Sequence, residues 1–216
     1  MIYKACLFDL DGVLVDTASY HYQAWKQLAH RFNFDLSLEQ NEELKGISRV
    51  ESLERILQWA NYQANSELKE IWLREKNEAY LNLISQMNPG EILPGVLDFL
   101  GQLKELGFLI ALGSASKNAE IILQKTGLLP WFDAIIDGNV VTTSKPNPEV
   151  FLKGAEALDC SANECIVFED AQAGIEAAKA AGMKVIGIDT HQTLKGADKI
   201  IPTFSGVDAQ SLLQFK

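Results

Sequence analysis

Short apolar runs alternate with amphipathic segments over the second part of the chain. Four runs predict β-strands, over residues 108–112, 134–136, 165–168 and 184–188. Apolar residues around them recur three or four positions apart, which predicts helices over residues 96–106, 116–125, 149–158 and 171–181. Strands and helices in alternation predict a parallel sheet with helices on both faces.

The beginning of the chain follows a different pattern. A first strand is predicted over residues 3–10, and the turn signal Asp11-Gly12 ends it. From about residue 16 to residue 83, apolar residues recur at helical spacing and no strand pattern interrupts them. A helical block therefore interrupts the α/β pattern directly after its first strand.

Two helix starts can be placed inside this block. Ser37 lies three residues before Gln40, and Ser48 lies three residues before Glu51. This is the spacing of a capping box, in which the two side chains satisfy free amides at a helix start. The block is long enough for four helices, so we expect a four-helix insert.

The expected fold is an α/β, doubly wound parallel-sheet core of Rossmann type with an inserted four-helix cap domain. The catalytic core would comprise residues 1–15 and 88–216, and the cap residues 16–87. Linkers would lie near residues 13–17 and 87–93. Two linkers between two bodies make a hinge, and hinges often close over ligands.

Charge and composition limit the partners and the location. Acidic residues outnumber Lys and Arg by 29 to 19, which gives a formal net charge of −10. Such a surface repels phosphate backbones and anionic lipids, so we expect neither nucleic acid nor a membrane as a partner. Asp9 and Asp11 interrupt the apolar N-terminal run, unlike in a signal peptide, and no run approaches the ~20 apolar residues of a membrane helix. We therefore expect a cytoplasmic protein, and a monomer because no apolar patch demands a second subunit.

Six polar residues lie at the ends of predicted strands or in the loops between them. They are Asp9, Asp11, Ser114, Lys145, Glu169 and Asp170. Ligands of open parallel sheets bind beyond the carboxyl ends of the strands, so we expect these side chains to meet at one edge. Carboxylates this close repel one another unless a cation lies between them, and an all-oxygen site favours Mg²⁺. Carboxylates, Mg²⁺, a lysine and a serine are the parts that phosphoryl transfer requires.

Each of these residues also has an ordinary structural interpretation. Asp-x-Asp-Gly is commonly a turn, and Asp170 could cap the helix that follows it. Ser114 could be a loop hydroxyl, and Lys145 a solvated side chain. The functional interpretation is favoured because the residues occur together, in this order and at strand ends.

The same residues resemble the motifs of a known family. The succession of Asp9-Leu10-Asp11-Gly12-Val13, Ser114, Lys145-Pro146 and Glu169-Asp170 resembles the motif set of the haloacid dehalogenase-like phosphotransferases. These motifs span the whole α/β core. The insert after the first motif resembles the helical cap of the family's first subclass.

The resemblance implies a role for each motif residue. Asp9 would be the nucleophile that becomes an aspartyl phosphate, and Asp11 would be the general acid and base. Ser114 and Lys145 would orient the transferring phosphoryl group. The Mg²⁺ ligands would be Asp9, Glu169, Asp170 and, through its backbone carbonyl, Asp11. The family often has Ser after the Glu-Asp pair, whereas this chain has Ala171 and lacks that hydroxyl.

A closer resemblance, to the sugar-phosphate mutases of this family, extends over nearly the whole chain. It rests on Thr17, His21, Trp25, residues 45–49, Ser52, Lys76-Asn77 and residues 114–118. It implies that Thr17 lies at the hinge and that the substrate is bound by His21, Trp25, Gly46, Ile47, Arg49, Ser52, Lys76, Ser116, Lys117 and Asn118.

Two predicted helix starts suit a second phosphate. The first carries Arg49 and Ser52 in its first turn, and a helix N-terminus together with an arginine favours an anion. The second is the predicted start at residues 116–118. For Arg49 and for Lys76, the alternative is a solvated helix face.

His21 is predicted one turn before Trp25 on the first cap helix. By itself it could be a polar residue at the edge of the cap core. The resemblance implies that His21 helps to position Asp11 when the cap closes, which would favour a sugar hydroxyl over water.

We therefore expect an Mg²⁺-dependent isomerase that interconverts β-D-glucose 1-phosphate and glucose 6-phosphate through an aspartyl phosphate and glucose 1,6-bisphosphate. Its partner would be a phosphorylated hexose. A sugar-phosphate phosphatase of the same fold is an alternative, because fold and nucleophile do not decide whether water attacks. A receiver-like phospho-Asp signalling module is another, but the long insert and Asp11 argue against it.

Overall fold

The computed structural model describes residues 3–191 and 193–215. Six strands form one sheet in the order β3-β2-β1-β4-β5-β6, and each neighbouring pair is parallel. The strands are β1 (Ala5–Phe8), β2 (Leu109–Gly113), β3 (Ala134–Ile136), β4 (Cys165–Glu169), β5 (Lys184–Ile188) and β6 (Lys199–Ile201). This is the order of a doubly wound, Rossmann-type sheet, so the expected fold class is confirmed.

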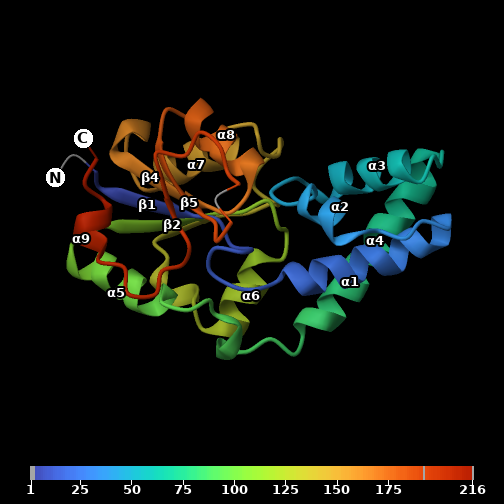
Figure 1. Cartoon of the computed structure of the whole chain (residues 1–216), viewed down its shortest axis with the longest axis horizontal. Helices are drawn as coiled ribbons and strands as arrows, with labels where there is room; N and C mark the ends of the chain where they lie inside the picture. The colour runs from blue at the N-terminus through green and yellow to red at the C-terminus, as the bar shows by residue number, and fades with distance from the viewer. Residues whose placement is uncertain (1–2, 192, 216) are drawn as a thin grey trace.

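Helices cover both faces of the sheet (Figure 1). They are α5 (Val96–Glu105), α6 (Ala119–Thr126), α7 (Glu149–Ala157), α8 (Gln172–Ala180) and α9 (Ala209–Leu212). Cys6 and Phe8 pack in a cluster with α5 and α6, whereas Ala5 and Leu7 pack with α7 and α8. Successive side chains of a strand point to opposite faces, so all four residues of β1 are buried. Because β1 is a central strand of the sheet, its carboxyl end lies in the middle of one edge of the sheet.

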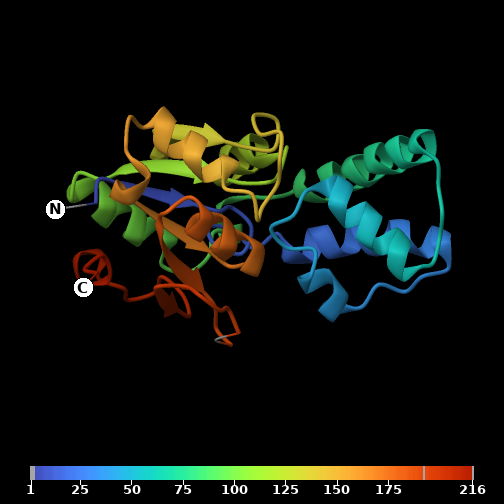
Figure 2. The same cartoon turned by 90° about the horizontal axis from the view of Figure 1, so that it is seen from above.

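Four further helices form a separate body between β1 and α5 (Figures 1 and 2). They are α1 (Ala18–Ala29), α2 (Leu38–Glu42), α3 (Arg49–Trp59) and α4 (Ser66–Ile84). This body has its own cluster of buried side chains, among them Trp25, Leu53 and Trp72. We call these helices the cap and the remaining described residues the core. The exact boundaries, at residues 15–16 and 87–88, stay a prediction.

The two connections between cap and core run side by side. The Leu93 amide donates to the carbonyl of Leu14 at 3.0 Å, and the Asp16 amide donates to the carbonyl of Glu91 at 3.1 Å. Both crossings therefore lie at one place, which is the arrangement that a hinge requires.

The two capping boxes predicted from the sequence correctly mark two helix starts inside the cap. Ser37 and Gln40 form a capping box at the start of α2, and Ser48 and Glu51 form one at the start of α3. Capping boxes can be predicted because their partners lie only three residues apart.

The predicted helix start at residue 116 is wrong, because α6 begins at Ala119. The Ser116 amide donates to the Ser114 hydroxyl at 3.1 Å, and the Asn118 amide donates to the Ser116 hydroxyl at 3.2 Å. These local bonds hold the segment in turns instead of a helix.

Short elements near the C-terminal end escaped prediction. Helix α9 has four residues, which is too few for a hydrophobic period to show, and β6 has only two apolar residues, Ile200 and Ile201, after Lys199. The short 3-10 helices, over His30–Phe32, Pro89–Glu91, Leu129–Trp131 and Ala162–Glu164, also have no such signal. Among the described residues, no helix combines the length and the apolar character needed to cross a membrane.

Candidate active site

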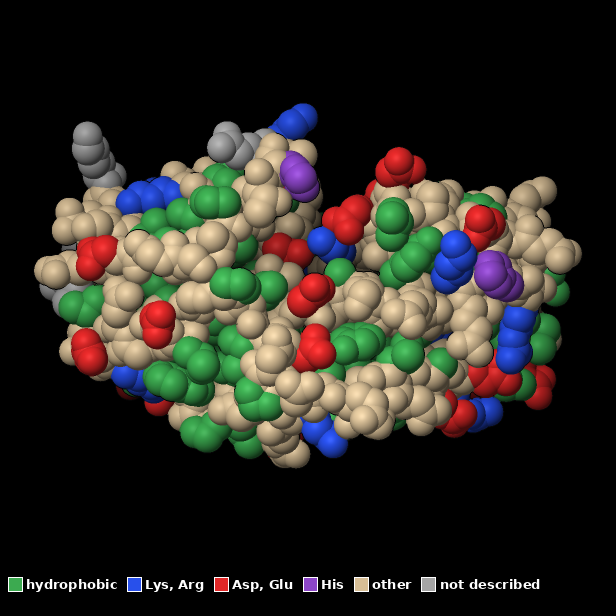
Figure 3. Space-filling view, turned by 60° about the horizontal axis from the view of Figure 1, so that its bottom comes forward, with side chains coloured by type: hydrophobic (Ala, Val, Ile, Leu, Met, Phe, Trp, Pro, Cys, Tyr) green, Lys and Arg blue, Asp and Glu red, His purple; other side chains and the backbone are tan. Residues whose placement is uncertain are grey.

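A cleft lies between the cap and the core, beyond the carboxyl ends of β1, β2 and β4. Most of the predicted site residues line it: Asp9, Asp11, His21, Trp25, Gly46, Ile47, Arg49, Ser52, Lys76, Ser114, Ser116, Asn118 and Asp170. Figure 3 shows acidic and basic side chains meeting where the surface is hollowed between the two bodies. The fold thus brings together residues that are far apart in the sequence.

Three carboxylates at the sheet edge form a set that fits a metal ion. One oxygen from each of Asp9, Glu169 and Asp170 lies within 4.8 Å of the others. Opposite ligands of an octahedral Mg²⁺ ion are about 4.2 Å apart, so one ion fits this set. The side chain of Asp11 is not part of the set, and only its backbone carbonyl remains as the predicted fourth ligand.

Two of these carboxylates need a nearby positive charge to stay ionised, because burial disfavours their charged forms. Burial raises the pKa of Glu169 to about 7, although Lys145 opposes the shift. Burial also raises the pKa of Asp170 well above its usual range. A buried carboxylate is stabilised in its charged form by a nearby positive charge. Both the lysine and a bound Mg²⁺ ion supply such a charge.

Lys145 lies beneath the cleft in the loop between β3 and α7, as expected, and is only 1% exposed. Its Nζ lies 2.5 Å from Oδ1 of Asp9 and also contacts the Glu169 carboxylate. Burial alone would lower the pKa of Lys145, but the two carboxylates outweigh it and hold the pKa above its usual value. The interpretation of Lys145 as a solvated side chain is therefore wrong.

Two glycines allow the carboxylates to approach the backbone. Gly12 has φ of +78°, and a Cβ there would lie 2.1 Å from an oxygen of Asp170. A Cβ on Gly174 would lie 1.9 Å from the carboxylate of Glu169. The glycine of the Asp-x-Asp-Gly motif is thus required by the site as well as by the turn.

Asp170 does not cap α8, so that structural alternative is wrong. The N-cap residue is Ala171, and no side chain caps the helix there. The Ala171 amide donates to Oε2 of Glu169 at 3.0 Å. The backbone at position 171 therefore orients Glu169 without the hydroxyl that Ser would add.

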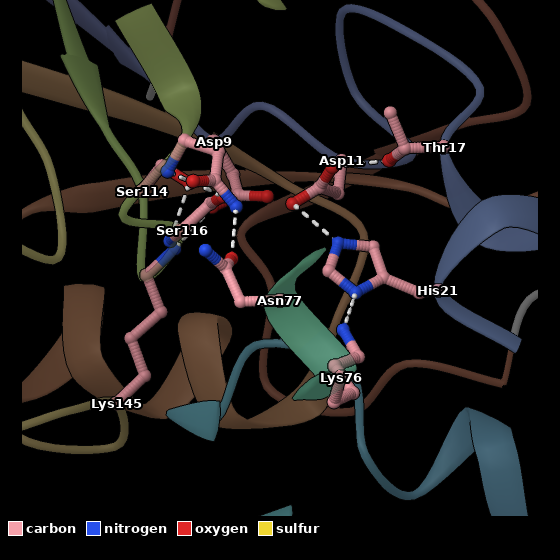
Figure 4. A network of polar contacts seen from close by, with 10 residues as sticks. Asp9, Asp11, Thr17, His21, Lys76, Asn77, Ser114, Ser116 and Lys145 are labelled. Atoms are coloured by element: carbon pink, nitrogen blue, oxygen red, sulfur yellow. Dashed lines mark hydrogen bonds and ion pairs between the residues drawn. The ribbon is translucent and has the colours of Figure 1, made fainter. Parts of the chain in front are cut away.

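Asp11 faces the cap (Figure 4). The hydroxyl of Thr17, just before α1, donates to its carboxylate. Nε2 of His21 lies 3.9 Å from Oδ2 of Asp11 and has no hydrogen-bond partner within the described residues. Burial, and then the charge of Asp9, raise the pKa of Asp11 to about 6. Asp11 can therefore hold or release a proton near neutral pH.

Lys76 connects α4 to His21 in the same region (Figure 4). Its Nζ lies 3.1 Å from Nδ1 of His21 and between 4.5 and 4.7 Å from the ring centroids of Trp25 and Tyr80. Lys76 is 3% exposed, so the interpretation of a solvated helix face is wrong. Burial, followed by the charge of Arg49, lowers the pKa of Lys76 to about 7.

The imidazole of His21 is held in its neutral form. Burial and the nearby charges of Lys76 and Arg49 lower its pKa well below the usual value. When the Lys76 ammonium donates to Nδ1, the remaining proton is on Nε2, the nitrogen that faces Asp11.

The core contributes a polar segment after β2. The Ser114 hydroxyl accepts the Ser116 amide, and Nδ2 of Asn118 donates to Oδ1 of Asn77 at 2.9 Å. Asn77 belongs to α4, so this bond joins the cap to the core (Figure 4). Ser114 and Asn118 are both buried despite their polarity.

The start of α3 contributes a cationic group from the cap. Ser48 caps the helix, Arg49 is its first residue, and Ser52 donates from its hydroxyl to the Ser48 carbonyl at 3.0 Å. Arg49 is half-buried and lines the cleft with Gly46. A helix N-terminus and a guanidinium are therefore directed to the same cavity.

The chain resembles proteins of known fold and chemistry. The family model described as haloacid dehalogenase-like hydrolase matches residues 3–182. The β-phosphoglucomutase of Bacillus subtilis is 42% identical over 212 residues, which are 97% of this chain and 93% of that protein. The chain belongs to the haloacid dehalogenase-like hydrolase family.

Two further comparisons place the chain inside this family. A crystal structure of β-phosphoglucomutase from Clostridium difficile matches with a TM-score of 0.93 and 40% identity, covering 97% of this chain and 95% of that one. A fructose-1-phosphate phosphatase of Escherichia coli is 31% identical and covers 86% of this chain and 96% of that protein. This member of the family is therefore an enzyme of phosphoryl transfer, and the family includes both mutases and sugar-phosphate phosphatases.

Four predicted site residues do not line the cleft. Glu169 and Lys145 lie beneath Asp9, and Thr17 is buried beside Asp11. Lys117 is exposed outside the lining and lies next to Gly138. The structure thus does not bring Lys117 to the other predicted binding residues, because the segment before α6 turns its side chain away.

Sequence reasoning missed several residues of the cleft. Asn41 and Leu44 line it from α2 and the turn after it, and Lys45 lines it and also lies 3.4 Å from the Asp170 carboxylate. Lys45 stands in the segment that resembles the sugar-phosphate mutases, so that signal could have found it. Asn41 is inside a short helix and has no sequence signal.

Proposed function

We propose that this chain is an Mg²⁺-dependent mutase that interconverts β-D-glucose 1-phosphate and glucose 6-phosphate through glucose 1,6-bisphosphate. The observation that carries the proposal is a cleft with two sets of anion-binding groups. On the core, the Ser114 hydroxyl lines the cleft and Lys145 lies directly beneath Asp9, and on the cap Arg49 lies at the start of α3. A bisphosphate intermediate requires both sets, whereas hydrolysis of a monophosphate requires only the first.

Asp9 would be the phosphoryl acceptor. Its carboxylate attacks the phosphorus atom, the bond to the sugar oxygen breaks, and an aspartyl phosphate forms. Lys145, 2.5 Å from Asp9, and the hydroxyl of Ser114 would hold the equatorial oxygens of the phosphoryl group. Bound Mg²⁺ would neutralise charge between the carboxylates and the phosphate, with Asp9, Glu169 and Asp170 as its ligands.

Asp11 would move the proton. With a pKa near 6, it can protonate the leaving sugar oxygen and later accept a proton from the attacking hydroxyl. On the cap side, the Thr17 hydroxyl donates to this carboxylate, and Nε2 of His21 faces it at 3.9 Å. Closure of the cap would therefore complete the acid–base site only when a sugar fills the cleft, which disfavours attack by water.

A sugar-phosphate phosphatase is the second candidate, and the fructose-1-phosphate phosphatase among the relatives favours it. Both reactions share the aspartyl phosphate and differ in what attacks it. The signalling module is set aside, because the chain belongs to an enzyme family and Asp11 faces a helical cap.

The test is a reaction of the purified protein with β-D-glucose 1-phosphate, Mg²⁺ and a trace of glucose 1,6-bisphosphate, followed by ³¹P NMR. Glucose 6-phosphate is the expected product, and its formation should depend on the bisphosphate. Release of inorganic phosphate alone would overturn the mutase proposal in favour of the phosphatase. The preference for a hexose phosphate, the monomeric state and the cytoplasmic location stay predictions.

A further inference from the structure

A further hydrogen bond joins the cap to the core through two residues that do not line the cleft. The hydroxyl of Ser144 donates to the carboxylate of Glu51. Glu51 is in the first turn of α3, and Ser144 is in the loop between β3 and α7. The contact therefore links two segments that are 93 residues apart in the chain.

On the cap side, Glu51 holds the start of α3. Its Oε2 accepts the Ser48 amide at 3.1 Å and the Ser48 hydroxyl at 2.8 Å, and the same atom accepts Ser144. Arg49 and Ser52 are in this first turn and face the cleft. The carboxylate that meets the core is thus the one that orders the phosphate-binding turn of the cap.

On the core side, Ser144 is the residue directly before Lys145. The two residues before it are held by Glu149, whose carboxylate accepts the amides of Thr142 and Thr143 at 3.0 and 2.8 Å and both threonine hydroxyls. Glu149 thus holds the beginning of this loop, and Glu51 holds it next to the lysine. A small shift at Ser144 moves the backbone from which the Lys145 side chain reaches Asp9.

The charge on Glu51 suits this role. Burial is the largest single influence and raises its pKa, but the hydroxyls of Ser144 and Ser48 and the Ser48 amide together outweigh it and leave the pKa below its usual value. The acceptor is therefore ionised at neutral pH, and hydrogen bonds to charged acceptors are stronger than neutral ones.

We propose that Glu51 and Ser144 are positioning residues that couple closure of α3 over the sugar phosphate to the placement of Lys145 beside Asp9. This rests on the proposed function. When α3 approaches, Glu51 engages Ser144 and the lysine loop takes its transfer position. When the cap is open, that contact is absent, and the lysine loop lacks its second support.

The first test is Ser144→Ala, which removes the cap–core contact and leaves the capping box of α3 intact. The expected result is a lower kcat at nearly unchanged KM, and a rise of about three- to tenfold in the ratio of inorganic phosphate to isomerised product, the size of one net hydrogen bond. Ser37→Ala is the matched control, because it removes a capping hydroxyl of the cap that makes no contact with the core. It should leave the ratio within about twofold of wild type.

A double-mutant cycle with Glu51→Ala tests whether the two residues act together. The Ser144→Ala effect should disappear in the Glu51→Ala background. Glu51→Gln should restore most of the wild-type ratio, because Gln40 shows that this side chain can complete a capping box and its amide oxygen can accept from Ser144. Equal effects of Ser144→Ala in both backgrounds would overturn the coupling.

A measurement of shape separates this inference from the proposed function. Small-angle X-ray scattering with Mg²⁺ and glucose 6-phosphate should give a larger radius of gyration for Ser144→Ala than for wild type. If wild type releases only inorganic phosphate, the mutase proposal fails while this comparison still tests the contact. Equal radii together with an unchanged kcat would overturn the positioning role.

Discussion

Nζ of Lys76 lies 3.1 Å from Nδ1 of His21, so the cap places a buried lysine against the imidazole that faces Asp11. Lys76 thereby orients the His21 ring toward Asp11, although Lys76 itself does not contact the core carboxylates. It also carries a cost, because burial penalises the charged lysine.

The first prediction concerns the pH dependence of stability that follows from Lys76. Its pKa falls from the model-peptide value of 10.5 to about 7 on folding, so the unfolded chain binds the proton more tightly between these values. The free energy of unfolding attributable to Lys76 should therefore rise as the pH increases from 7 to 10. Lys76→Met has a similar volume and no charge, and urea unfolding should show that it lacks this rise. A parallel rise in both proteins would contradict the prediction.

The second prediction concerns the nucleophile. Asp9→Asn should abolish turnover, because an amide does not form a stable phosphoryl intermediate. The fold should persist, since the side chain keeps its shape beside Lys145. Mass spectrometry after reaction with sugar phosphate should show no added phosphate, and circular dichroism should match wild type. Substantial turnover would exclude Asp9 as the phosphoryl acceptor.

The third prediction concerns proton transfer by Asp11. Asp11→Asn should lower kcat by about 10²- to 10⁴-fold, the range typical of lost acid–base catalysis. The loss should be smaller for a substrate with a good leaving group, such as an aryl phosphate, because that leaving oxygen needs no proton. Steady-state kinetics on both substrates provides the comparison. An unchanged rate on the sugar phosphate would remove Asp11 from the mechanism.

The fourth prediction concerns the alanine after the Glu-Asp pair. Since the Ala171 amide already orients Glu169, Ala171→Ser should change the Mg²⁺ affinity by less than about threefold. Gly174→Ala is the contrasting variant, because its Cβ would collide with the Glu169 carboxylate and should weaken Mg²⁺ binding strongly. Isothermal titration of Mg²⁺ into both variants compares them. A tenfold gain for Ala171→Ser would show that the hydroxyl matters.

The fifth prediction concerns an ion pair that holds the edge of the sheet. The Asp198 carboxylate accepts from Lys179, Lys184 and the Val185 amide, and together these outweigh burial and lower its pKa to about 2. The stability that it supplies is present above pH 4 and should be lost as the pH falls toward 2. Asp198→Asn should cost about 1 kcal/mol at pH 7 in urea unfolding, since both lysines are partly exposed. A constant difference down to pH 3 would contradict this.

Sequence patterns determined parts of the fold and of the site in two situations. In the first, the interacting residues are only a few positions apart in the sequence. In the second, a general rule of parallel sheets brings distant residues together. The capping boxes at Ser37 and Ser48 were predictable because their partners lie three residues away. The meeting of Asp9, Ser114 and Asp170 was predictable because parallel strands end at one edge. Strand β6 was not predictable, because it begins with Lys199 and offers only two consecutive apolar residues.

Only the tertiary structure decided which charged side chains are buried and which contacts join the two bodies. The sequence predicts that both Lys76 and Lys117 bind substrate. In the structure, the cap buries Lys76, whereas the turn before α6 leaves Lys117 exposed to solvent. The bond between Ser144 and Glu51 depends on how the cap lies against the core. A sequence pattern records spacing along one chain segment. The pKa of a lysine and the coupling of two loops depend on the distances between segments that only the folded chain brings together.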